Sequence, residues 1–255
     1  MRVALSSPSF CHVPFAEFLP RVAAEFKVWE IVNEGRHVLW DVAQEFRQLA
    51  PSYDLAFQVH APISDVNVGA SNPRAHAFAT AEVRKTVEWA GKLGIPRVTV
   101  HPGWFATLTK GRRELVHART LEALKVAARQ ARDVGVELCV ENMPAVHYAA
   151  YTTPEQMREL LDDLREPGVK LTFDAAHANV AKNVREFLDL RRLFGNVHLS
   201  DNLGDRDAHL PLGKGTVPLR EVVEALAPAQ PTFVIEAPDW DGGLEGKAHL
   251  SSLLA

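Results

Sequence analysis

Six apolar runs of this sequence carry a histidine or an acidic residue at or near their C-terminal end. These residues are His60, His101, Glu141, Asp174, His198 and Glu236. The run VKLTFD (169–174) is typical of a buried strand until its last residue, and a buried carboxylate is costly unless it is paired or bound to a metal ion. Three imidazoles and three carboxylates in equivalent positions therefore indicate one shared polar site.

The combination of imidazole with carboxylate suits zinc, manganese, cobalt or iron better than magnesium or calcium, which favour oxygen ligands. Cysteine is absent from the set, so an open catalytic centre, with zinc or manganese as the first choice of ion, fits better than a structural zinc site. Three further residues follow these runs in loops, namely His177, Asp207 and His209, and are expected at the same site.

Parity along each run supports this interpretation, because successive side chains of a strand point to opposite faces. In VELCVE (136–141), Val136, Leu138 and Val140 share one face, whereas Glu137, Cys139 and Glu141 share the other. The same count puts all six strand-end residues on the inward face. Chance would scatter them over both faces and both ends.

Eight strand-like runs alternate with helical segments along the chain. The runs are 2–6, 27–32, 55–60, 97–101, 136–141, 169–174, 196–200 and 232–236, and the clearest helical segments are 14–26, 118–135 and 153–168. This rhythm predicts a (β/α)8 barrel, an α/β fold, as a single domain over residues 1–255. The alternative is a doubly wound open sheet, which usually has a glycine-rich turn after its first strand, and none follows residues 2–6. In a barrel, the six strand ends converge on one mouth.

Some of these residues also have simpler explanations. His60 and His101, each taken alone, are more often satisfied core histidines, and Asp174 alone could cap a helix that begins near Asn179. Their shared inward parity favours ligands. The remaining loop and helix histidines are expected at the surface, and include His12, His37, His76, His117 and His249.

Composition sets limits on partners and location. The formal net charge of −4 gives no general attraction to nucleic acid. The start, MRVALSS, lacks signal-peptide organisation, no apolar stretch approaches the roughly 20 residues that span a bilayer, and the two cysteines form no CxxC motif. A cytoplasmic protein without membrane partners is expected, and a homo-oligomer is compatible with the sequence.

Several motifs together point to one superfamily. They are VHAP (59–62), VHPGW (100–104), VENMP (140–144), FDAAHAN (173–179), NVHLSDN (196–202), DRDAHLPLGKG (205–215) and VIEAP (234–238). With these motifs in order, the chain resembles the xylose isomerase-like barrel superfamily, which includes sugar-phosphate isomerases and epimerases and the endonuclease IV type of apurinic endonuclease.

The resemblance implies one of two sites. In the endonuclease branch, a trinuclear zinc cluster is bound at the positions of His60, His101, Glu141, Asp174, His177, His198, Asp207, His209 and Glu236. In the isomerase and epimerase branch, one divalent ion is bound at the positions of Glu141, Asp174, His198 and Glu236. There the two glutamates also move the proton, and the residue matching His177 contacts the sugar.

Departures from the nuclease pattern favour the second site. Ile63 replaces an aromatic residue that usually lies near DNA, the glycine-rich opening of the nucleases is missing, and Lys214 stands where an acid is usual close to the metals. The leading expectation is an isomerase or epimerase of a small sugar, sugar phosphate or keto acid, with Glu141, Glu236 and His177 catalytic. The alternative is a zinc-dependent apurinic endonuclease or phosphodiesterase acting on DNA. A non-catalytic metal- or ligand-binding barrel is the third possibility.

Overall fold

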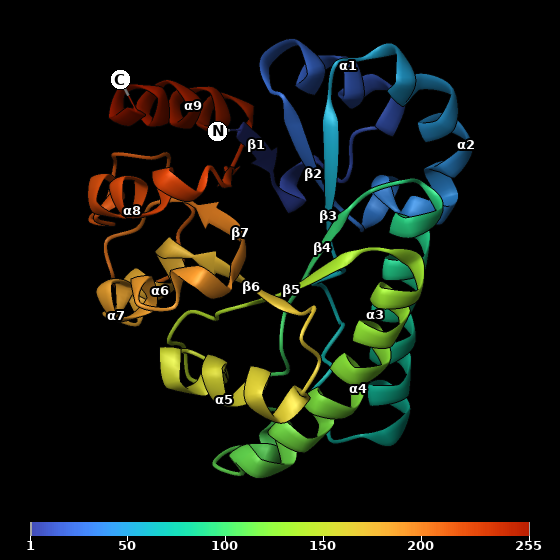
Figure 1. Cartoon of the computed structure of the whole chain (residues 1–255), viewed down its shortest axis with the longest axis vertical. Helices are drawn as coiled ribbons and strands as arrows, with labels where there is room; N and C mark the ends of the chain where they lie inside the picture. The colour runs from blue at the N-terminus through green and yellow to red at the C-terminus, as the bar shows by residue number, and fades with distance from the viewer. Residues whose placement is uncertain (1, 255) are drawn as a thin grey trace.

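Eight parallel strands close into a barrel at the centre of the molecule, as the computed structural model of residues 2–254 shows (Figure 1). The strands are β1 (Arg2–Ser6), β2 (Val28–Val32), β3 (Ala56–His60), β4 (Arg97–Val100), β5 (Glu137–Glu141), β6 (Lys170–Asp174), β7 (Phe194–Leu199) and β8 (Thr232–Glu236). Each pairs with the next in sequence and β8 pairs with β1, so the predicted (β/α)8 fold is confirmed. Residues 1 and 255 of the predicted domain lie outside the described part.

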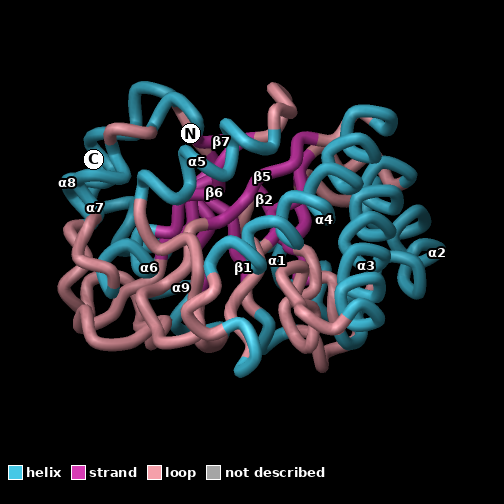
Figure 2. Tube along the Cα trace, turned by 90° about the horizontal axis from the view of Figure 1, so that it is seen from below, coloured by secondary structure: helices cyan, strands magenta, loops and turns pink. Residues whose placement is uncertain are grey.

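Helices surround the strands on the outside (Figure 2). They are α1 (Phe15–Glu25), α2 (Leu39–Leu49), α3 (Pro73–Lys92), α4 (Arg113–Val134), α5 (Pro154–Leu164), α6 (Ala175–Val180), α7 (Val184–Leu188), α8 (Leu219–Leu226) and α9 (Trp240–Leu254). Local signals fix several ends. The Thr153 side chain caps α5 by accepting from the amide of Gln156, and Gly135 ends α4 with a φ of 71°. Within residues 2–254, no helix has both the length and the apolar character to cross a membrane.

The two faces of the strands differ as parity predicted. Outward residues such as Leu138, Phe173 and Phe233 are fully or almost fully buried in the core shared with the helices. Inward residues fill the barrel interior in layers, and across that interior the hydroxyls of Thr99 and Thr172 form a hydrogen bond of 2.8 Å. The barrel therefore has an apolar outer wall and a largely polar inner surface near its C-terminal end.

Strand register brings the C-terminal ends to one level. Asp174 of β6 is the lateral partner of His198 of β7, and Ser6 of β1 is the partner of Glu236 of β8. Lateral partners in a sheet lie on the same face, so a carboxylate and an imidazole come together without help from the loops.

Two histidines that were expected at the surface are buried. His37 is 1% exposed because the turn between β2 and α2 inserts its ring among Phe15, Phe18 and Trp29. His76 is 5% exposed in α3, with its Nε2 3.0 Å from the carbonyl of Arg119. In both cases packing between neighbouring elements covers the ring, which local sequence does not reveal.

The burial of His37 predicts a loss of stability in acid. Burial lowers the pKa of His37 from 6.5 to about 4, so the unfolded chain binds more protons between these values. Above pH 6.5 the ring is neutral in both states and costs no stability. As the pH falls from 6.5 to 4, protonation of the unfolded chain lowers the free energy of unfolding by about 3 kcal/mol. Urea denaturation of His37→Leu across this range should show a shallower pH dependence than the unchanged protein.

The exposed His147→Gln variant is the control for this comparison and should retain the original slope. Equal slopes for His37→Leu and the unchanged protein would contradict the assignment.

Candidate metal centre

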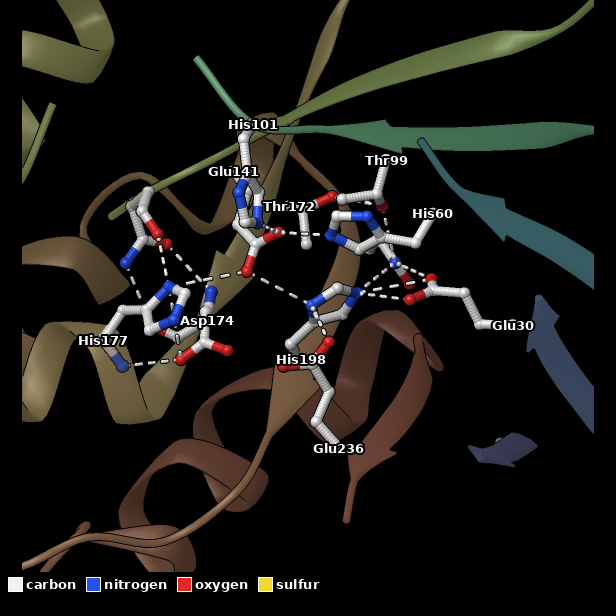
Figure 3. Close-up of polar contacts among 12 residues, drawn as sticks. Glu30, His60, Thr99, His101, Glu141, Thr172, Asp174, His177, His198 and Glu236 are labelled. Carbon is white, nitrogen blue, oxygen red and sulfur yellow. Dashed lines mark hydrogen bonds and ion pairs between the residues drawn. The ribbon is translucent and has the colours of Figure 1, made fainter. Parts of the chain in front are cut away.

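All nine predicted ligands lie at the C-terminal mouth of the barrel. Figure 3 shows those at the strand ends together with His177. Three donor groups include all nine, and we call them the central group (Glu141, Asp174, His198 and Glu236), the β3–β4 group (His60, His101 and Glu141) and the loop group (His177, Asp207 and His209). A fourth combination, His60 with His198 and Glu236, overlaps the first two. Within each group the ligand atoms lie within 4.8 Å of one another. Glu141 belongs to both the central and the β3–β4 group, and its Oε1 lies 3.5 Å from Nδ1 of His177 in the loop group, so the three groups form one continuous centre.

The central group is the most buried of the three. His198 Nδ1 lies 3.3 Å from Glu141 Oε1 and 3.2 Å from Glu236 Oε1. That nitrogen and Asp174 Oδ2 have no hydrogen-bond partner among the described residues, although both are buried. Buried polar atoms are normally hydrogen-bonded, so two unpartnered ligand atoms within the same group fit a cation ligated there.

In the β3–β4 group, two imidazoles face one carboxylate oxygen. Glu141 Oε2 lies 3.1 Å from His60 Nε2 and 3.3 Å from His101 Nε2. The Nδ1 of His60 is 2.7 Å from the carbonyl of Ala61 and donates to it, which leaves the lone pair of a neutral ring on Nε2. A lone pair that faces a carboxylate is stable only with a proton or a cation between them, and an Nδ1 fixed in this way is typical of a metal-binding histidine.

The loop group has the same organisation. The Nδ1 of His177 lies 2.8 Å from the carbonyl of Asn142, and its Nε2 is 3.2 Å from Asp207 Oδ2. The same Asp207 oxygen lies 3.0 Å from His209 Nε2. Asp207 Oδ1 is buried without a partner among the described residues, so this group also offers an unused donor atom.

Asp174 caps a helix with one carboxylate oxygen and leaves the other without a partner in the described chain. Its Oδ1 accepts from the amide of His177 at 2.6 Å and caps α6, which begins at once after β6 and not near Asn179. Its Oδ2 belongs to the centre and has no other partner in the described chain. The two oxygens of one carboxylate thus do the two tasks.

The electrostatics of the mouth reflect several buried carboxylates in a small volume. Burial, reinforced by the carboxylates of Glu236 and Glu141, raises the pKa of Asp174 to about 7. Burial also acts to raise the pKa of Glu236, but the His198 imidazole outweighs it and lowers that pKa to about 2. For His209, burial is outweighed by Asp207 and Glu236, and its pKa rises to about 9. Protonated groups therefore offset the negative charge here, and a divalent cation would replace those protons.

One buried acid of this region was not among the predicted ligands. Glu30 lies in the middle of β2, on its inward face, and is 0% exposed. Its Oε1 is 3.0 Å from His198 Nε2, and its Oε2 accepts from the amides of Gln58 (2.6 Å) and Asn196 (2.9 Å). The strand-end pattern could not include it, but a single acid on the inward parity of an apolar run was the available signal.

Lys214 does not lie where the sequence placed it. Its side chain is 64% exposed, and its Nζ is 3.9 Å from Glu245 of α9. The amides of Gly213 and Gly215 both donate to Asp201 Oδ2, so the backbone wraps around that carboxylate while the lysine between them faces outward. The residue is paired at the surface and does not meet the donor groups.

Similarity to known proteins agrees with this arrangement. Residues 22–251 match the family described as the xylose isomerase-like TIM barrel. The chain belongs to this family. An uncharacterized protein of Methanocaldococcus jannaschii is 32% identical over 232 residues, covering 89% of this chain and 79% of the relative.

Solved structures of xylose isomerase-like barrels superpose on almost the whole chain. A D-tagatose 3-epimerase-like protein has a TM-score of 0.91 and 29% identity, covering 100% of this chain and 97% of the other. Endonuclease IV from Thermus thermophilus has a TM-score of 0.75 and 22% identity, covering 100% and 99%. Both branches named by the sequence motifs are thus structural neighbours of this xylose isomerase-like barrel.

The double use of Asp174 predicts that capping and metal binding can be separated. Asp174→Asn keeps an oxygen that can accept from the amide of His177, so α6 should remain capped while metal affinity falls. Asp174→Ala loses both functions and should also lose about 1 kcal/mol of stability. Urea denaturation in chelator and zinc titration by calorimetry measure the two effects. Zinc binding by Asp174→Asn as tight as in the unchanged protein would contradict the role of Oδ2.

Proposed function

We propose that this chain is a divalent-metal-dependent isomerase or epimerase of a small sugar, a sugar phosphate or a related keto acid. The observation that carries the proposal is the central group. It presents two glutamates from different strands, Glu141 of β5 and Glu236 of β8, on either side of His198 Nδ1. A pair of carboxylates at one metal position is suited to removing a proton and returning it on another face.

The division of labour within the central group follows from its contacts. A divalent ion held by Glu141, Asp174, His198 and Glu236 would polarise the substrate carbonyl and its neighbouring hydroxyl. It would so acidify the C–H bond of the carbon that bears this hydroxyl. Glu141 and Glu236 each direct Oε1 to this group and keep a second oxygen for the proton. Both are ionised, because nearby imidazoles hold each carboxyl pKa below its usual range against the effect of burial.

Residues around the glutamates would orient the substrate. His177 is fixed through Nδ1 by the carbonyl of Asn142, so its Nε2 can contact a sugar hydroxyl from the side of α6. His209 Nδ1 lies 3.8 Å from Glu236 Oε2, within reach of the oxygen that would carry the proton. The similarity to a D-tagatose 3-epimerase-like protein over the whole chain supports this assignment.

A second candidate function is a phosphodiesterase of the endonuclease IV type, and the two additional donor groups favour it. If the β3–β4 group holds an ion, Glu141 Oε2 is a ligand to that ion and cannot act as a base. The two functions therefore place incompatible demands on one oxygen atom. The number of bound ions distinguishes them.

The first test is metal content together with exchange of substrate protons. We expect about one divalent ion per chain, and incorporation of deuterium next to the carbonyl when a panel of ketoses and their phosphates is incubated in D2O and followed by NMR. Glu141→Gln and Glu236→Gln should abolish the exchange without unfolding the protein. Glu137→Gln, at the opposite end of β5, is the matched control and should retain it.

Other outcomes would overturn the proposal. Two or three zinc ions with chelator-sensitive nicking of an abasic duplex would establish the phosphodiesterase instead. A protein that retains no metal, and that no metal stabilises against heat, would be a non-catalytic barrel, because a ligand bound only by the folded state must stabilise it.

A further inference from the structure

We infer that Glu30 is a positioning residue that determines which nitrogen of His198 faces the central group. This inference rests on the proposed function to the extent that the central group binds a metal ion. Glu30 itself lies on the opposite side of His198 from Glu141 and Glu236, so it acts through the imidazole and not on the substrate (Figure 3).

Glu30 accepts hydrogen bonds from two side-chain amides. Its Oε2 receives the side-chain amides of Gln58 at 2.6 Å and Asn196 at 2.9 Å, and amide nitrogens only donate. All three side chains are at least 97% buried, so no water competes for these positions. His198 Nε2 lies 3.0 Å from the remaining oxygen, Oε1, and forms its hydrogen bond with Oε2 at 3.3 Å, while Oε1 has no hydrogen-bond partner in the described chain.

The amide hydrogens of Gln58 and Asn196 are shared among several acceptors around Glu30. Gln58 Nε2 donates to Glu30 Oε2 and to Asn196 Oδ1, which fixes the orientation of the Asn196 amide. Asn196 Nδ2 then has two hydrogens and three neighbours within reach, namely Glu30 Oε2 at 2.9 Å, Thr99 Oγ1 at 3.1 Å and His198 Nε2 at 3.1 Å. The carboxylate is the strongest acceptor of the three and takes one of these hydrogens.

The hydrogen on His198 Nε2 is assigned by its contact with the Glu30 carboxylate. Nε2 lies 3.0 Å from Oε1 and 3.3 Å from Oε2, and a lone pair there would face a carboxylate, so Nε2 carries a hydrogen and donates it to Glu30. Nδ1 is then the ring atom that is left for a proton or a metal ion. That atom is the one between Glu141 and Glu236 that has no hydrogen-bond partner among the described residues. With an ion bound to the central group, Glu30 and His198 would complete a carboxylate–histidine–metal arrangement, in which the outer carboxylate sets the tautomer and raises the basicity of the ligand.

Orientation of a histidine by Glu30 is specific to His198 and so to the groups that contain it. His60 and His177 are oriented by backbone carbonyls, those of Ala61 and Asn142, and bind through Nε2. His198 alone among these three is oriented by a side chain and presents Nδ1. A change at Glu30 should therefore weaken the central group and leave the β3–β4 and loop groups unaffected.

The test is Glu30→Gln, which retains size but can place an NH2 group opposite His198 Nε2. The ring should then accept at Nε2, carry its hydrogen on Nδ1 and lose its ligand atom. We expect zinc affinity of the central group, measured by chelator competition, to fall by roughly 10- to 100-fold. Glu137→Gln, another inward glutamate of the barrel with Arg97 as its partner, is the matched control and should bind zinc as the unchanged protein does.

A second readout does not depend on the stability of the variant. In the unchanged zinc-loaded protein with 15N-labelled histidine, NMR should show His198 protonated at Nε2 and metal-bound at Nδ1, with the assignment made from the signal missing in His198→Gln. Glu30→Asp, which restores a carboxylate, should recover part of the affinity lost in Glu30→Gln.

The outcomes separate this inference from the proposed function. If the unchanged protein binds zinc at the central group but His198 does so through Nε2, or if Glu30→Gln binds equally well, the role of Glu30 is wrong while the metal centre stands. If the unchanged protein binds no divalent ion, the proposed function fails, and the inference about Glu30 fails with it.

Discussion

The structure depends on burying several carboxylates together at one end of a barrel. Glu141, Asp174 and Glu236 are each at most 8% exposed, and each ends a strand whose outward residues are apolar. Such a cluster would destabilise the fold if its charge were not offset by imidazoles, protons or a cation. The closed barrel makes this possible because its fixed register brings acid and imidazole to the same level on adjacent strands.

The interior around this cluster is closely packed. A small apolar group of Ala4, Val28 and Val234 fills part of it like any packed barrel core, and Val234 is the lateral partner of His198. The amide and hydroxyl network around Glu30 also contacts His198, and it offers hydrogen bonds of fixed direction. Ligands held on rigid strands by such a network need little reorganisation when an ion or a substrate arrives.

The sequence predicted the strands to within two residues and all nine residues at the mouth, because alternation and strand ends are local patterns. It failed where a tertiary contact decides the outcome. The burial of His37 depends on aromatic rings from α1 and β2, and the outward turn of Lys214 depends on Asp201. Glu30 is intermediate, since its parity was readable but its partners come from β3 and β7.

The two oxygens of Asp174 link the centre to the chain beyond it. One caps α6 and the other faces the donor atoms, so any ion that draws on this carboxylate also acts on the first turn of a helix only six residues long. Ligand binding and local opening of a helix are thermodynamically reciprocal. Amide hydrogen exchange in α6 is therefore a reporter of occupancy at the mouth, read from the backbone and independent of any knowledge of the substrate.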